Sequence, residues 1–117
     1  LAMAGGAAAA QAAGAVKVEN ALAQCVAVQP GMRTVTDGQL LLQADLEVKQ
    51  SIGRCGCKSA IATYTSRVEL EGQHRSFLQS GSIAIKQSGS RTLTLASDDQ
   101  LVGDRTVVLS LGCAAPD

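Results

Sequence analysis

Hydrophobic residues recur at every second position over most of this chain, and this period constrains the fold more than any other feature. In residues 40–48 the even positions are all apolar, whereas the odd positions between them are mostly polar. A period of two places one face of an extended strand against a core and the other in water. The same alternation recurs in residues 83–86, 92–95 and 106–111. We therefore expect strands, and no segment shows the period of an amphipathic helix of useful length.

Turn-forming residues divide these runs at intervals of about ten to fifteen residues. The expected breaks are Pro30-Gly31, Asp37-Gly38, Glu71-Gly72, Ser80-Gly81 and Val102-Gly103-Asp104. Short strands at this spacing are typical of sandwiches. The pattern predicts an all-β fold, an immunoglobulin-like antiparallel β-sandwich of about seven strands. A chain of 117 residues suits one domain, which we place at residues 16–117.

In residues 57–70 the apolar residues do not stay on the same alternating set of positions. Cys57 and Ile61 favour the odd positions as the core face, whereas the apolar residues of 64–70 favour the even ones. One extra residue in a strand switches the face on which the following side chains lie. We therefore expect a β-bulge near Ala62 and Thr63.

The aromatic and histidine residues are few. The chain has one tyrosine, Tyr64, one phenylalanine, Phe77, and no tryptophan. We expect both aromatic side chains in the core. His74 follows Gly72 and is expected in a solvated loop. One histidine and no cluster of carboxylates argue against acid–base catalysis, so we expect no enzyme and no cofactor.

The first fifteen residues contain nine alanines and no charge. Ala2 and Ala4 form the A-x-A pattern that signal peptidase accepts, with cleavage before Gly5. Residues 1–15 are therefore either a flexible Ala/Gly-rich tail or the remnant of a signal peptide. They are too short and too weakly apolar to span a bilayer, and we expect no membrane insertion.

Four cysteines, Cys25, Cys55, Cys57 and Cys113, suit an oxidising compartment and allow three pairings. Residues i and i+2 of a strand lie about 6.6 Å apart, near the upper limit for a disulfide, so a Cys55–Cys57 bridge needs a bend at Gly56. We prefer this local bridge together with Cys25–Cys113, which would tie the first strand to the last. A zinc site is disfavoured because the chain has no C-x-x-C and no pair of histidines.

Charge is balanced over the chain but not along it. Ten basic and ten acidic residues give a formal net charge of zero, which argues against a nucleic-acid partner. Residues 49–91, however, carry seven cations against Glu69 and Glu71, a balance of +5. Scattered cations keep sheet edges soluble, but a positive face also attracts a polar or mildly acidic polypeptide. The candidate client-binding residues are Lys49, Arg54, Lys58, Arg67, Arg75, Lys86 and Arg91.

Several strings of this sequence resemble one family of small bacterial proteins. Leu46-Glu47-Val48-Lys49-Gln50-Ser51 leads to the C-x-C motif Cys55-Gly56-Cys57 and then Lys58, and Arg91-Thr92-Leu93-Thr94-Leu95 and Ser97-Asp98-Asp99 follow. Over about residues 40–112 these strings resemble the periplasmic curli amyloid inhibitors, the CsgC and CsgH group, and are closer to the CsgH branch. The C-x-C motif after a strand is the most specific element.

The resemblance implies a chaperone-like protein of the periplasm that keeps a disordered curli-type amyloid subunit from polymerising. Such a protein needs no cofactor, and we expect it to be a monomer that holds its client by transient electrostatic contacts. Two alternatives remain open. One is a thiol-disulfide oxidoreductase that uses Cys55 and Cys57, and the other is a structural or adhesive module of the cell envelope.

Overall fold

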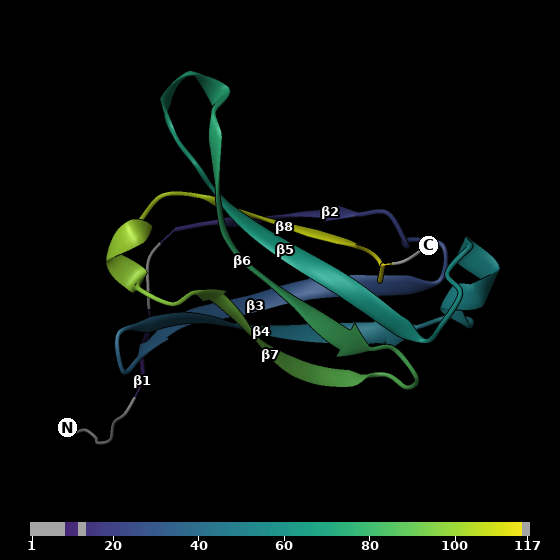
Figure 1. Cartoon of the computed structure of the whole chain (residues 1–117). Helices are drawn as coiled ribbons and strands as arrows, with labels where there is room; N and C mark the ends of the chain where they lie inside the picture. Colours follow the sequence, from purple (N-terminus) through teal and green to yellow (C-terminus); the bar gives the residue numbers. More distant parts are fainter. Residues whose placement is uncertain (1–8, 12–13, 116–117) are drawn as a thin grey trace.

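Two β-sheets pack face to face in the computed structural model, which describes residues 9–11 and 14–115 (Figure 1). One sheet has the order β1 (Ala9–Gln11), β3 (Val26–Thr36), β4 (Gln39–Val48) and β7 (Gly89–Ala96). The other has the order β2 (Val16–Asn20), β8 (Val107–Cys113), β5 (Ile61–Glu69) and β6 (Arg75–Ala84). Three short 3-10 helices, η1 (Ile52–Cys55), η2 (Glu71–Gln73) and η3 (Asp99–Leu101), lie between strands. The expected all-β sandwich is confirmed.

The N-terminal segment contributes a strand to each sheet. Residues 9–11, which we expected in a tail, pair antiparallel with β3, and Val16–Asn20 then pairs parallel with β8. The described chain thus has eight strands, and one of its strand pairs is parallel. The A-x-A pattern lies outside the described residues. Among the described residues, no helix is long and apolar enough to cross a membrane.

The core lies between the sheets, where the alternation predicted it. In β4 the even positions from Leu40 to Leu46 are buried, and in β8 the odd positions from Val107 to Leu111 are buried. Val108 is also fully buried, although it lies on the outer face between Lys17 and Arg67 in register. Long charged side chains shield apolar surface in this way.

The predicted bulge near Ala62 and Thr63 is wrong. Both residues pair with β6 and β8 in uninterrupted register, and every even position from Ala62 to Val68 is buried. Cys57 precedes the strand, so its position in the core says nothing about strand phase. The irregularity of this hairpin lies in β6, where Leu78 is the extra residue between the partners of Ser66 and Arg67.

Two of the expected breaks lie inside strands. Pro30-Gly31 belongs to a β-bulge of β3, where Gly31 and Met32 together oppose Gln43. The bulge requires glycine, because a Cβ at Gly31 would lie 2.8 Å from the carbonyl oxygen of Gln43. Its extra residue switches the facing of the strand, so that Arg33 points into the protein.

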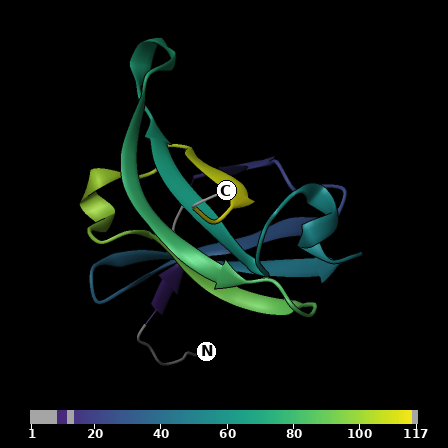
Figure 2. The ribbon, with the colours of Figure 1, turned by 45° about the vertical axis from the view of Figure 1, so that its right-hand side comes forward.

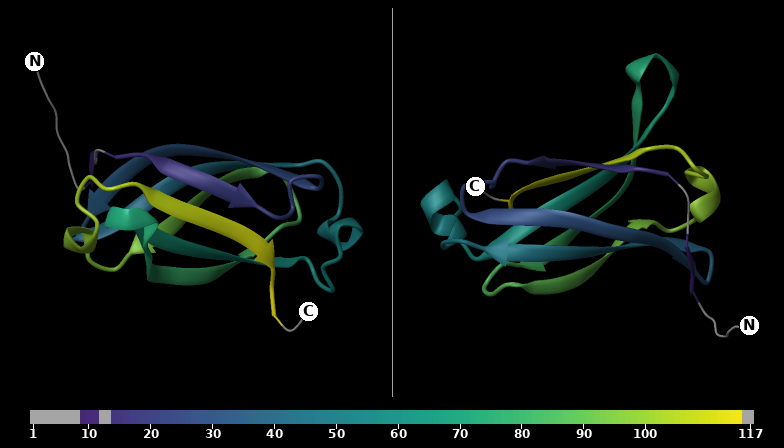
Figure 3. Two further views of the ribbon diagram at one scale, coloured as in Figure 1. Left: turned by 90° about the horizontal axis from the view of Figure 1, so that it is seen from above. Right: turned by 180° about the vertical axis from the view of Figure 1, so that it is seen from behind.

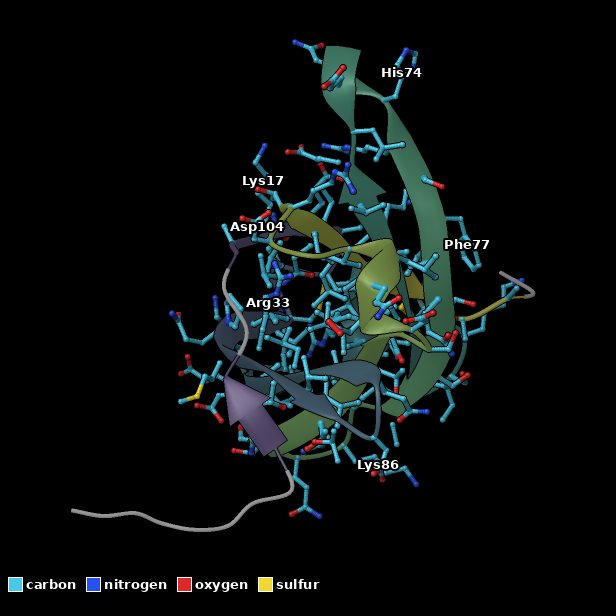
Figure 4. All side chains as sticks on the ribbon, turned by 90° about the vertical axis from the view of Figure 1, so that its left-hand side faces the viewer. Lys17, Arg33, His74, Phe77, Lys86 and Asp104 are labelled. Carbon is cyan, nitrogen blue, oxygen red and sulfur yellow. A yellow bond between two sulfur atoms is a disulfide. The ribbon has the colours of Figure 1, made fainter. Side chains whose placement is uncertain are left out.

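Ser80-Gly81 lies within β6, where Gly81 pairs with Tyr64 of β5. A Cβ at Gly81 would lie 2.6 Å from Cε1 of Tyr64, so the glycine leaves space for the ring. The Tyr64 hydroxyl donates a hydrogen bond to the carbonyl of Thr94 in the other sheet, at 3.0 Å. Tyr64 is buried, as expected. The expectation for Phe77 is wrong, because 61% of it is exposed and its ring projects from β6 (Figure 4).

The β5–β6 hairpin extends beyond the body of the sandwich (Figure 2). Its tip contains Gly72, whose φ of 71° favours glycine, and His74, which is exposed as expected. At the two ends of the sandwich, loop residues close the core: Leu22 and Ile52 at one end and Val102 at the other are all buried. Figure 3 shows these ends, with η1 at the first and η3 at the second.

Candidate functional site

Two disulfides fasten one end of the sandwich. Cys25 is bonded to Cys55 and Cys57 to Cys113, so the expected pairs Cys25–Cys113 and Cys55–Cys57 are wrong. Gly56 lies between the two bridges with a φ of 99°, and it turns the chain at the end of η1. We expected this bend to close a bridge between Cys55 and Cys57. Instead it directs Cys55 to the start of β3 in one sheet and Cys57 to the end of β8 in the other. The described chain has no free cysteine, and two disulfides place the protein outside the reducing cytoplasm.

Four of the seven candidate cations lie in the loops at this end. We call it the basic end and define it by the exposed residues Lys49, Arg54, Lys58 and Lys86. Its loops, residues 21–25, 49–60 and 85–88, contain no Asp or Glu. The nearest preceding acids, Asp45 and Glu47, are exposed on β4, and Asp45 accepts a hydrogen bond from Ser90 at 2.5 Å.

Two of these cations share a hollow of about 320 Å³, which we call the Lys49/Lys86 hollow. It lies where β4 ends at Val48 and β6 ends at Ala84, and thus at the open end of both sheets. Its lining residues are Val48, Lys49, Gln50, Ser51, Ala60, Ile85 and Lys86. Backbone hydrogen bonds fix its walls: Ile85 N donates to Ala60 O at 2.7 Å, and Lys49 N donates to Cys25 O at 2.7 Å.

Arg54 lines a second hollow, between η1 and the loop that joins β2 to β3. This hollow measures about 450 Å³ and is lined by Asn20, Ala21, Ala23, Gln24, Arg54 and Cys55. The two hollows adjoin, because Lys49 Nζ contacts the carbonyl of Ala23 at 3.4 Å and Gln50 donates to the carbonyl of Gln24 at 3.1 Å. The basic end is therefore one continuous surface.

The cations Arg67 and Arg75 lie elsewhere, on the outer face of the β2-β8-β5-β6 sheet. Arg75 donates to both carboxylate oxygens of Glu19, at 3.0 and 3.3 Å, and lies 3.8 Å from Glu69. The hydrogen bond from Arg75 lowers the pKa of Glu19. Lys17 completes the network with an ion pair to Glu69 at 3.0 Å. Arg67 donates to Ser110 Oγ at 3.5 Å on the same face. Three cations thus lie beside two carboxylates here, so most of their positive charge is compensated.

Arg91, the seventh candidate, serves the fold. Its guanidinium donates to the carbonyls of Ala84 at the end of β6, Gln87 in the following turn and Ser90 at the start of β7. It therefore holds this turn and is not counted in the basic end. The structure thus places four of the seven candidates in the loops of the basic end and the other three elsewhere.

The opposite end of the sandwich is acidic. It carries Asp37, Asp98, Asp99 and Asp104 against the exposed Arg105, and Asp99 N donates to the carbonyl of Gly38 at 2.8 Å. We call it the acidic end. The two ends of the sandwich therefore carry exposed charge of opposite sign. The charge balance of residues 49–91 did not reveal this, because Asp37 and Asp99 are far apart in sequence.

Arg33 is a residue whose role the sequence did not indicate. It is 3% exposed and donates to the carbonyls of Ala15, Gly103 and Arg105 at 3.1, 3.1 and 2.9 Å. Burial lowers its pKa, and the negative charges of Asp104 and Asp99 oppose that shift. Figure 4 shows Arg33 inside the sandwich below Asp104. It joins the N-terminal segment to the β7–β8 loop.

The comparisons with known proteins identify a family. A family model described as "Uncharacterized protein conserved in bacteria (DUF2195)" matches residues 1–116. No curated protein and no solved structure matches the chain. Because the matched region covers nearly the whole sequence, this chain belongs to the bacterial family DUF2195.

Proposed function

We propose that this protein is a chaperone-like inhibitor of curli-type amyloid assembly in the bacterial periplasm, and that it holds the disordered subunit by transient contacts at its basic end. The observation that carries the proposal is the gathering of Lys49, Arg54, Lys58 and Lys86 over loops without acidic residues. Such a field attracts a mildly acidic polypeptide and gives weak, salt-sensitive binding. The resemblance of residues 40–112 to curli inhibitors supplies the client.

The edge strands of the two sheets support a role in which the protein binds an aggregation-prone chain without nucleating a fibre from it. An exposed, regular edge strand offers its backbone groups to another strand and can nucleate a fibre. The four edge strands are β1, β7, β2 and β6. β1 has three residues, β7 has a bulge at Leu95 against β4, β2 presents Lys17 and Glu19, and β6 is interrupted by the bulge at Leu78. Each edge is thus short, charged or irregular, as in proteins that avoid strand addition.

The alternative of a thiol-disulfide oxidoreductase draws no support from the disulfide geometry. A dithiol cycle within the C-x-C motif needs a bridge between Cys55 and Cys57, whereas each of them is bonded to a distant cysteine. The alternative of an adhesive module needs an edge that adds strands, and it predicts self-association. The proposed inhibitor is a monomer, which sedimentation equilibrium distinguishes from an adhesive assembly.

The direct test follows fibre formation of a purified curli-type subunit by thioflavin T fluorescence. With one molecule of inhibitor for ten of subunit, we expect a longer lag than for the subunit alone. Raising the salt concentration from 0.15 to 1 M shortens the screening length from about 8 to about 3 Å, so the added lag should shrink relative to the subunit at the same salt. An unchanged lag at a one-to-one ratio would rule out the proposal.

A further inference from the structure

We propose that the Lys49/Lys86 hollow binds an acidic side chain that lies next to an apolar one in an extended polypeptide. The proposal rests on the function proposed above and names the part of the client that is recognised. The lining of the hollow contains two ammonium groups and no carboxylate. A concave site lined by charge of one sign concentrates counterions, and the ammonium groups suit a carboxylate because their donors rotate freely.

Neutral polar groups add direction to this charge. Ser51 Oγ accepts a hydrogen bond from Gly53 N at 3.2 Å, which leaves its hydroxyl proton to donate to a carboxylate. The amide nitrogen of Gln50 donates to the carbonyl of Gln24. This bond occupies the amide nitrogen and fixes the orientation of the Gln50 side chain. Its amide oxygen is then the atom that accepts a hydrogen bond from a backbone N–H of the client.

The floor of the hollow is apolar. Val48, Ala60 and Ile85 line it, and Ile85 is only 3% exposed. Val48 N donates to Ser88 Oγ at 2.9 Å, so the ends of β4 and of the β6–β7 turn are held together and the floor is preformed. A volume of about 320 Å³ lies at the lower limit of ligand sites, which suits a pair of side chains better than a larger ligand.

The Arg54 hollow lacks this combination. Its lining has one guanidinium, polar Asn20 and Gln24, and two alanines in place of the larger aliphatic side chains. It therefore offers charge without an apolar floor. This contrast provides an internal control, because a ligand recognised by charge alone would occupy both hollows, whereas an acidic–apolar pair would prefer the Lys49/Lys86 hollow.

The test uses acetylated, amidated hexapeptides that contain Leu-Asp, Leu-Asn or Ser-Asp between Gly and Ser residues, titrated into the ¹⁵N-labelled protein. We expect the Leu-Asp peptide to give saturable amide shifts at Ala60 and Ile85, and the other two to bind about fivefold more weakly. The double variant Lys49→Gln/Lys86→Gln should lose these shifts. Arg105→Glu, which changes the net charge equally at the acidic end, should keep them. Equal binding of the Leu-Asn peptide, or shifts centred on Arg54, would overturn the proposal.

Failure of this site and failure of the function give different results. If Lys49→Gln/Lys86→Gln delays fibres as well as the wild-type protein while Arg54→Gln/Lys58→Gln does not, the hollow is overturned and the function stands. If the Leu-Asp peptide binds the hollow but the wild-type protein leaves fibre formation unchanged, the site stands and the function fails.

Discussion

Replacing the buried Arg33 by methionine should destabilise the protein strongly, because one side chain holds three segments together. Its guanidinium donates to the carbonyls of Ala15, Gly103 and Arg105, which belong to the N-terminal segment and the β7–β8 loop. Arg33→Met keeps most of the volume of the side chain and removes all three hydrogen bonds. Gly14 belongs to the same arrangement, since a Cβ there would collide with Nη1 of Arg33.

The magnitude follows from opposing contributions. A hydrogen bond to a charged group contributes about 1.5–3 kcal/mol, so three give a gross loss of about 4.5–9 kcal/mol. Removing a buried charge recovers several kcal/mol of desolvation, and Nε of Arg33 has no hydrogen-bond partner among the described residues, so its own desolvation is uncompensated. We expect a net loss of about 3 kcal/mol in the free energy of unfolding.

Urea denaturation followed by far-ultraviolet circular dichroism measures this loss. With a slope of about 1.5 kcal/mol per molar urea, 3 kcal/mol lowers the midpoint by about 2 M. Arg105→Ala is the control, because Arg105 contributes only its backbone carbonyl to the network and its side chain is exposed. A midpoint for Arg33→Met within the error of the wild-type value would refute the role of this network.

Three further predictions concern the core and the disulfides. Gly81→Ala should lower the free energy of unfolding by about 2 kcal/mol in the same denaturation assay, because its Cβ would overlap the Tyr64 ring. The control Gly112→Ala, whose Cβ meets nothing within 4 Å, should change it by less than about 0.5 kcal/mol. Equal losses in the two variants would contradict this packing. Burial raises the pKa of Tyr64 above the ordinary tyrosine value of 10.0, so the free energy of unfolding should fall as the pH rises beyond the pKa of tyrosine in the unfolded chain. Absorbance at 295 nm reports this single tyrosine and should show no ionisation at pH 10.0. Cys25→Ser/Cys55→Ser and Cys57→Ser/Cys113→Ser should each cost about 4 kcal/mol, from sequence separations of 30 and 56 residues, and a non-reducing peptide map that joins Cys25 to Cys113 would disprove the pairing.

Strand alternation carried most of the fold prediction because it reports burial directly. The even positions of residues 40–48 and the odd positions of residues 107–111 face the core as predicted. The pattern failed where the chain leaves the regular period. Pro30-Gly31 resembles a turn in sequence but forms a bulge. Only the pairs on either side of it, Pro30 with Ala44 and Arg33 with Leu42, reveal that the strand continues and that Arg33 turns inward.

Contacts between distant residues could not be predicted from local patterns. The cysteine spacing allowed three pairings, and the correct one depends on where the ends of β3 and β8 lie relative to Gly56. In the same way, the seven cations of residues 49–91 formed one candidate set in sequence. The fold separates them because Arg67 and Arg75 face Glu19 and Glu69, whereas Lys49 and Lys86 meet at the ends of different sheets.

The proposed role of the basic end is tested most directly by the lag time of curli-type fibre formation with two variants of equal charge. The first neutralises Lys49, Arg54, Lys58 and Lys86 to glutamine, and the second combines Arg105→Glu, Ser97→Glu and Gln100→Glu at the acidic end. Each lowers the net charge by four. We predict that the first variant loses most of the added lag and that the second keeps it. Equal loss in both variants, or full inhibition by the first, would contradict the account.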